Sequence, residues 1–302
     1  MVKFESFIAA LALSTGVLAH PTIKHVDRRF CALEERNLFA REELTSRATI
    51  PKATKWNPPS NMVTALDQVW KQTMKENPQG LQDKNWLTDQ IIANNGNVNY
   101  CVRWNHKGKS TAAARASTVK ALQRSLQKWF DVLVGFEGFP VTKLNVNVVG
   151  YAVKNKNLIE GDTTGLDIYT TTNPDGVPEC DTRCYRALHL DGDMSQCPGG
   201  KDSRYDISLW LDEELTGQFG GYGYNWGQEL GPDYFLNNVN LDNIHILLHE
   251  MGHGFGLLDF YDWTPQGQTS FIMMAGSATE ITEFDAWMLR QWYVKLKAAR
   301  GW

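Results

Sequence analysis

The segment His249–Asp259, which reads HEMGHGFGLLD, constrains the fold of this chain more than any other part of it. His249 and His253 are four residues apart, so on a helix they lie on one face and both rings can reach one metal ion. Gly256 can adopt the positive φ that ends a helix and turns the chain. The segment therefore predicts a helix, then a turn that brings Asp259 back to the two imidazoles.

Two imidazoles, one carboxylate and one open position are the donor set of a catalytic zinc. We therefore predict Zn²⁺ held by His249, His253 and Asp259, with Glu250 as the catalytic base that acts on a zinc-bound water. The alternative is an ordinary buried helix whose histidines form hydrogen bonds inside the core. The apolar surroundings favour the metal site, because a buried carboxylate needs a partner such as a cation. These surroundings are Ile244, Ile246, Leu247, Leu248 and Met251.

The same eleven residues resemble the active-site consensus of the metzincin zinc peptidases. The usual third ligand of that family is His, and Asp259 at this position resembles the snapalysin-type members. The family also has a Met-containing turn below the zinc, for which Phe271–Gly276 is the candidate, with Met273 as its methionine and Met274 next to it. Plain core packing is the alternative for this pair. The resemblance is specific over residues 245–276, although the tyrosine that follows the Met-turn in several metzincin groups is missing.

The resemblance implies an α+β fold: a metzincin-like mixed twisted sheet with a long packing helix, a zinc-site helix, a Met-turn and a C-terminal helix. Hydrophobic periodicity predicts elements in that order. Helices are expected over residues 61–75, 81–94, 110–133 and 241–253 and from Thr282 on, with Asp285 as a capping partner, and strands over 98–104, 144–149 and 207–211. Residues 155–204 are expected to form a long loop region.

The N-terminal fifty residues are expected to be removed. Residues 1–19 have a positive start, an apolar stretch and a small residue at the end, which is typical of a secretory signal peptide. Residues 20–50 are polar and charge-rich and indicate a removable pro-segment or a linker, with Arg28-Arg29 and Arg47 as candidate processing points. Residues 51–302 are then one catalytic domain of acceptable size, secreted to the extracellular space.

Five cysteines fit a secreted chain in which one lies in the pro-segment. Cys31 is that one, and its thiolate either occupies the open zinc position and keeps the enzyme latent or is an unpaired thiol discarded with the pro-segment. The other four can form two disulfides with three connectivities, among which the sequence does not choose. Our prediction pairs Cys180 with Cys184 and Cys101 with Cys197.

Several further residues near the predicted site have two interpretations. His245 is one turn before His249 and is expected in the core or beside the ligands rather than on the metal. Asp262 competes with Asp259 as third ligand, but its spacing does not match the consensus. Tyr261 and Trp263 either shape the cleft or pack in the core. Tyr222, Tyr224 and Trp226 lie among glycines in residues 217–227, which indicates a mobile loop or strand edge by the cleft, or a surface loop anchored by aromatics.

Two classes of function remain open. The first is a secreted zinc endopeptidase that acts on proteins or peptides. The second is a carbohydrate- or cell-wall-binding protein with a structural zinc, in which the eleven tryptophans and ten tyrosines stack on extracellular polysaccharide. A structural zinc has no need of Glu250, which favours the peptidase. A net charge of −4 argues against nucleic acid or an anionic membrane surface as a partner, and no apolar segment reaches the roughly 20 residues that span a bilayer.

Overall fold

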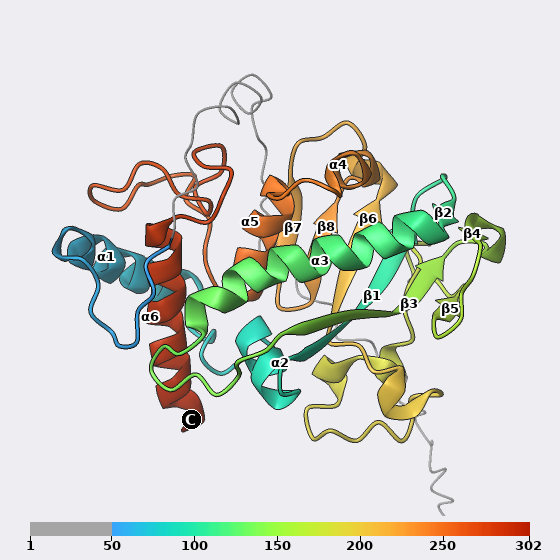
Figure 1. Ribbon diagram of the computed structural model, residues 1–302, viewed down its shortest axis with the longest axis horizontal. Coiled ribbons are helices and arrows are strands. Elements are labelled where there is room, and N and C mark those ends of the chain that lie inside the picture. The colour runs from blue at the N-terminus through green and yellow to red at the C-terminus, as the bar shows by residue number, and fades with distance from the viewer. Residues whose placement is uncertain (1–49) are drawn as a thin grey trace, which may run out of the picture.

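A six-stranded sheet organises the chain in the computed structural model, which describes residues 50–302 (Figure 1). The strand order is β5-β3-β1-β6-β8-β7, and every neighbouring pair is parallel except β7 with β8. Its strands are β1 (Asn97–Asn105), β3 (Asn145–Val153), β5 (Asp167–Tyr169), β6 (Ile207–Asp212), β7 (Gly221–Tyr224) and β8 (Gly227–Leu230). The short strands β2 (Ser110–Thr111) and β4 (Ile159–Glu160) pair separately. The fold is therefore mixed α/β with a mostly parallel sheet.

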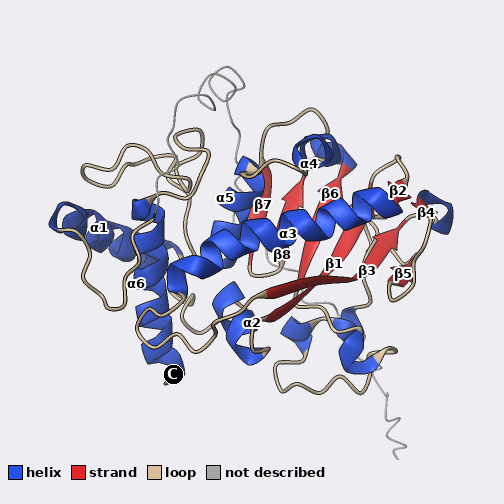
Figure 2. Ribbon diagram, in the orientation of Figure 1, coloured by secondary structure: helices blue, strands red, loops and turns tan. Residues whose placement is uncertain are grey.

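The described residues form six α-helices, of which α3 and α5 cover one face of the sheet (Figure 2). They are α1 (Ser60–Glu76), α2 (Leu87–Ala93), α3 (Ala112–Leu133), α4 (Pro232–Asn238), α5 (His245–Gly254) and α6 (Glu283–Arg300). The long helix α3 starts where the Thr111 hydroxyl oxygen accepts a hydrogen bond from the Ala114 amide at 3.1 Å. Its buried face includes Leu122, Leu126, Phe130 and Leu133, as the helical spacing of apolar residues predicts. No helix within residues 50–302 has the length and apolarity to cross a membrane.

Two predicted helices are shorter than expected. The segment before α2 folds into turns, because Gly80 and Gln82 donate to the carbonyls of residues 77 and 79 and the Trp86 indole donates to the Gly80 carbonyl at 2.7 Å. Helix α5 starts at His245 rather than near residue 241, since the chain first turns after α4 and Leu241 donates to the Asn238 carbonyl. The loop region predicted for residues 155–204 also contains β4, β5 and several short 3₁₀ turns.

Successive side chains of a strand point to opposite faces of the sheet, and each face of this sheet packs against a core of its own. Val98, Tyr100, Val102 and Trp104 of β1 point to the helices and join the main core. Cys101 of the same strand points the other way, into a small cluster beneath residues 180–205 that contains Ala152, Met194, Tyr205 and the bonded cysteines. We name these two sides the helical face and the disulfide face.

The predicted disulfide pairing is wrong, although all four cysteines are bonded. The structure joins Cys101 to Cys180 and Cys184 to Cys197, with sequence separations of 79 and 13 residues. The physical reason is that Thr182–Cys184 forms a 3₁₀ turn, so that Cys184 faces Cys197 while Cys180 remains beside β1. Cys31 lies outside the described residues, as do the signal peptide and nearly all of the predicted pro-segment.

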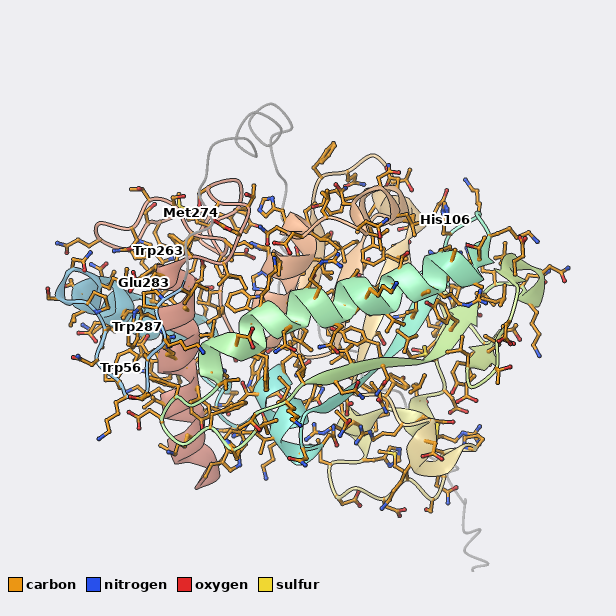
Figure 3. All side chains as sticks on the ribbon, viewed as in Figure 1. Trp56, His106, Trp263, Met274, Glu283 and Trp287 are labelled. Carbon is orange, nitrogen blue, oxygen red and sulfur yellow. A yellow bond between two sulfur atoms is a disulfide. The ribbon has the colours of Figure 1, made fainter. Side chains whose placement is uncertain are left out.

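The first described residues are attached to α6 and to the turn after α3. Arg290, which is buried on α6, donates to the Pro51 carbonyl at 2.8 Å, and the Glu137 amide donates to the Thr54 carbonyl at 2.9 Å. The Trp56 indole packs edge-on against Trp287 with ring centroids 5.8 Å apart (Figure 3). The chain from Pro51 onward therefore packs as part of the same body as the sheet.

Candidate metal centre

Helix α5 ends as the sequence predicts. Gly256 has a φ of +94°, the left-handed conformation that glycine adopts readily, and the Leu257 amide donates back to the Gly252 carbonyl at 3.2 Å. A side chain at residue 256 would also collide with Trp292, since a Cβ there would lie 2.5 Å from the indole ring. This turn reverses the chain and returns Asp259 to the histidines of α5.

Three donor atoms converge at this point. Asp259 Oδ1 lies 3.0 Å from His249 Nε2 and 3.3 Å from His253 Nε2. The two Nε2 atoms are 3.1 Å apart. Ligands about 2.0–2.1 Å from a tetrahedral zinc would be about 3.3 Å from one another, so the three atoms are spaced as such a site requires.

The outer nitrogens of both rings fix which protons the histidines carry. His249 Nδ1 donates to the Ile272 carbonyl and His253 Nδ1 donates to the Leu257 carbonyl, each at 2.7 Å. A carbonyl only accepts, so each Nδ1 carries a proton, and a neutral ring of either histidine then presents an Nε2 lone pair to the other. Two lone pairs and a carboxylate oxygen so close together repel one another unless a cation lies among them. This is the arrangement that orients histidines for a metal ion.

Glu250 lies beside these atoms and is almost completely buried. His249, Glu250 and His253 offer donor atoms that all lie within 4.8 Å of one another, a group that could hold a metal ion. Glu250 Oε2 is 3.9 Å from His253 Nε2, and Glu250 Oε1 has no hydrogen-bond partner among the described residues. Burial raises the pKa of Glu250 to about 7. A buried carboxylate oxygen without a partner is costly, which indicates that it faces a bound water or ligand.

Asp259 and His253 shift each other's pKa in opposite directions. Burial by itself raises the pKa of Asp259, but the two histidines outweigh it and hold that pKa well below its usual range. Burial lowers the pKa of His253, and the Asp259 carboxylate outweighs this effect and raises it. Negative charge is therefore retained at Asp259, as a ligand for a cation requires.

Strand β7 packs directly against Glu250. A Cβ at Gly223 would lie 2.2 Å from the Glu250 carbonyl oxygen, and a Cβ at Gly221 would lie 3.1 Å from Glu250 Oε1. Only glycine allows this approach. The signal was present in the alternation of Gly221 and Gly223 with two tyrosines, and of the two interpretations of residues 217–227 the strand edge is the one observed.

Met273 packs under α5 at the level of the ligands. It is fully buried, and a Cβ at Gly252 would lie 2.2 Å from its sulfur, so Gly252 makes room for this side chain between His249 and His253. The residue before it, Ile272, supplies the carbonyl that orients His249. The segment 271–276 is thus placed beneath the candidate metal centre. The importance of the Ile272 carbonyl was missed, since no side-chain pattern reports it.

The remaining candidates lie outside this group. His245 is buried, its Nε2 has no hydrogen-bond partner among residues 50–302, and burial lowers its pKa to about 3. Asp262 is exposed and does not join the converging atoms. Trp263 is partly buried and packs against Phe260, whereas Tyr261 is exposed.

No family model, curated protein or solved structure matches this chain. The interpretation of the site therefore depends on its own geometry and chemistry.

Proposed function

We propose that this protein is a secreted zinc endopeptidase of the metzincin type, with an aspartate as third ligand. The observation that carries the proposal is the convergence of His249 Nε2, His253 Nε2 and Asp259 Oδ1 beside the buried carboxylate of Glu250. A zinc-binding site that serves only stability closes its fourth position with a protein ligand. The described residues offer only three side chains in this cluster besides Glu250, and Glu250 Oε1 remains without a partner.

His249, His253 and Asp259 would hold the zinc, which when bound lowers the pKa of a coordinated water and polarises the substrate carbonyl. Glu250 accepts a proton from the attacking water at its free Oε1 and later delivers a proton to the leaving amine. The Ile272 and Leu257 carbonyls keep both histidines in the tautomer whose Nε2 can bind metal. Met273 fills the space under the ligands and limits the movement of α5.

Substrate binding is expected along β7. This strand is at the edge of the sheet and is antiparallel to β8. An extended peptide can add to such an edge through main-chain hydrogen bonds. Gly221 and Gly223 place that edge against Glu250, so the scissile bond of an added peptide would lie next to the catalytic carboxylate.

The two disulfides are compatible with an extracellular location and support secretion as part of the proposal. The polysaccharide-binding alternative receives less support. The side chains of Trp86, Trp104, Trp129, Trp210, Trp287 and Trp292 are buried, so they serve the core rather than a stacking surface.

The decisive experiment compares the mature wild-type protein with Glu250→Gln. The glutamine keeps nearly the same volume but accepts no proton from water at neutral pH, so we expect at least about a hundredfold loss of peptide cleavage with zinc content unchanged. Glu214→Gln, at an exposed position, is the matched control and should cut like the wild type. A chelator should stop the wild type. Wild-type inactivity on a broad peptide library, with equal polysaccharide binding by both forms, would favour the binding protein instead.

A further inference from the structure

Helix α6 is connected to the metal ligands through the turn under α5. Ile272 stands at the centre of this connection, because its carbonyl accepts the Nδ1 proton of His249 at 2.7 Å. The position of that carbonyl decides the direction in which His249 Nε2 points. Anything that fixes the backbone at residues 272 and 273 therefore fixes a candidate metal ligand.

The backbone at this turn is held by the carboxylate of Asp285, which is fully buried. The Ile272 amide donates to Asp285 Oδ2 at 2.8 Å, and the Met273 amide donates to Asp285 Oδ1 at 3.2 Å. The two carboxylate oxygens thus bind consecutive amides, which restricts both translation and rotation of the peptide unit between them. A carboxylate accepts hydrogen bonds from N–H groups more strongly than a neutral side chain does.

We propose that Asp285 is a positioning residue of the metal centre, which sets the orientation of His249 through the Ile272–Met273 turn. This inference rests on the metal-binding part of the proposed function but not on peptide cleavage. The proposal gives Asp285 a second role, since the sequence indicates this residue only as a helix cap. It also makes the beginning of α6 part of the site, although Asp285 follows Asp259 by 26 residues.

The cap itself is the competing explanation for Asp285. Its carboxylate accepts hydrogen bonds from the Thr282 amide at 2.8 Å and from the Thr282 hydroxyl at 2.6 Å, while its own amide donates to Thr282 Oγ1 at 3.3 Å. These contacts stabilise the first turn of α6 and have no connection to His249. Thr282→Ala separates the two roles of Asp285, because it weakens the cap of α6 and leaves the Ile272 and Met273 amides bonded to the carboxylate.

The test uses the mature protein stripped of metal and measures two properties: zinc affinity, by competition with a chromophoric chelator, and the visible spectrum after loading with Co²⁺. In Asp285→Asn one carboxylate oxygen becomes an NH₂ group, which faces an amide donor whichever way the side chain is turned, so the turn loses at least one hydrogen bond. We expect zinc affinity to fall at least about tenfold, with an altered Co²⁺ spectrum, as when the partner of a ligating histidine is disturbed. Thr282→Ala should stay within about threefold of wild type with an unchanged spectrum, even though both variants unfold at a lower temperature.

A pair of double variants tests whether the effect passes through His249. In a His249→Ala background the Asp285→Asn change should have no further effect on the remaining zinc affinity, whereas in a His253→Ala background the tenfold loss should persist. If Asp285→Asn does not fold, Asp285→Glu replaces it, since it keeps the charge but moves the carboxylate by one methylene, and the same loss relative to Thr282→Ala is expected.

The outcomes separate the two proposals. Equal zinc affinity and equal Co²⁺ spectra for the Asp285 and Thr282 variants would overturn the positioning role. Loss of affinity in both His backgrounds alike would also overturn it, because a general loosening of the fold would then be the cause. A wild type that binds neither Zn²⁺ nor Co²⁺ would overturn the metal centre together with this inference, whereas a wild type that binds zinc but cuts no peptide contradicts only the peptidase.

Discussion

The two faces of the sheet are held together in different ways. On the helical face, the candidate metal centre is built from a ten-residue helix, a glycine turn and backbone carbonyls that orient the histidines. On the disulfide face, residues 180–205 form a small core whose order depends on two covalent bonds. There Arg103 stacks over the Trp210 ring at 4.2 Å, and the carboxylate of Asp206 is completely buried at the start of β6.

The two faces differ in the interactions that stabilise them. The helical face has a large apolar core, so burial of side chains holds the ligands in place. Buried charged residues such as Arg290 and Asp285 lie at its margins, where they bind backbone groups. The disulfide face buries few apolar residues and relies on cross-links and charged hydrogen bonds, as small domains with little core do. We therefore expect changes on one face to leave the other nearly unaffected.

The largest effect is expected from the disulfide that joins the disulfide face to β1. Replacing Cys101 and Cys180 by serine opens a loop of 79 residues and should lower the free energy of unfolding by about 4–5 kcal/mol, against about 3 kcal/mol for Cys184 and Cys197 with 13 residues. Urea unfolding of the metal-loaded proteins measures both values. Zinc affinity of the folded fraction should not change, and a drop in that affinity would contradict the independence of the faces.

The converse change removes a ligand from the helical face. His253→Ala should weaken zinc binding on the order of a thousandfold, about 4 kcal/mol, because even loss of a ligand's hydrogen-bond partner costs 10–100-fold. Elemental analysis after gel filtration would show one zinc per wild-type chain and little in the variant. His189→Ala on the disulfide face is the matched control and should retain the metal. Full zinc occupancy in His253→Ala would refute this ligand assignment.

A pH-dependent effect is expected from Asp206. Burial raises its pKa to about 6 in the folded protein, against 3.8 for an ordinary aspartate. A folded pKa above the unfolded one gives stability that is fully present below pH 3.8 and is lost as the pH rises through 6. Between pH 4 and pH 7 the wild type should therefore lose up to about 3 kcal/mol relative to Asp206→Asn. Urea unfolding of both metal-free proteins at four pH values tests this, and parallel curves would show that Asp206 does not titrate in this range.

The smallest effect is expected where α5 touches Met273. Gly252→Ala places a methyl group 2.2 Å from the Met273 sulfur, and such overpacking costs about 1–3 kcal/mol. In a Met273→Ala background the space is already open, so the same change should cost little. Thermal unfolding of the four proteins in this cycle measures the difference. Equal costs in both backgrounds would mean that Gly252 and Met273 do not share the contact.

Local features of the sequence were sufficient for much of the helical face. The spacing of His249 and His253, the left-handed turn at Gly256, the apolar stripe of α3 and the start of α6 after Thr282 all depend on residues within a few positions of one another. Helix periodicity and capping act over one or two turns, so they are readable without the rest of the fold. The assignments of Zn²⁺, of Glu250 as catalytic base and of peptide cleavage remain predictions from that same chemistry.

Tertiary structure decided what depends on residues far apart in the chain. The pairing of Cys101 with Cys180 rather than Cys197 follows from which segment lies beside β1, and four cysteines allow three pairings of similar spacing. Asp285 binds the Ile272 and Met273 amides, which are 13 and 12 positions away, and Glu250 is packed against Gly221 and Gly223, which are 29 and 27 positions away. Backbone amides and carbonyls are the same at every residue, so no side-chain pattern reports which of them will meet.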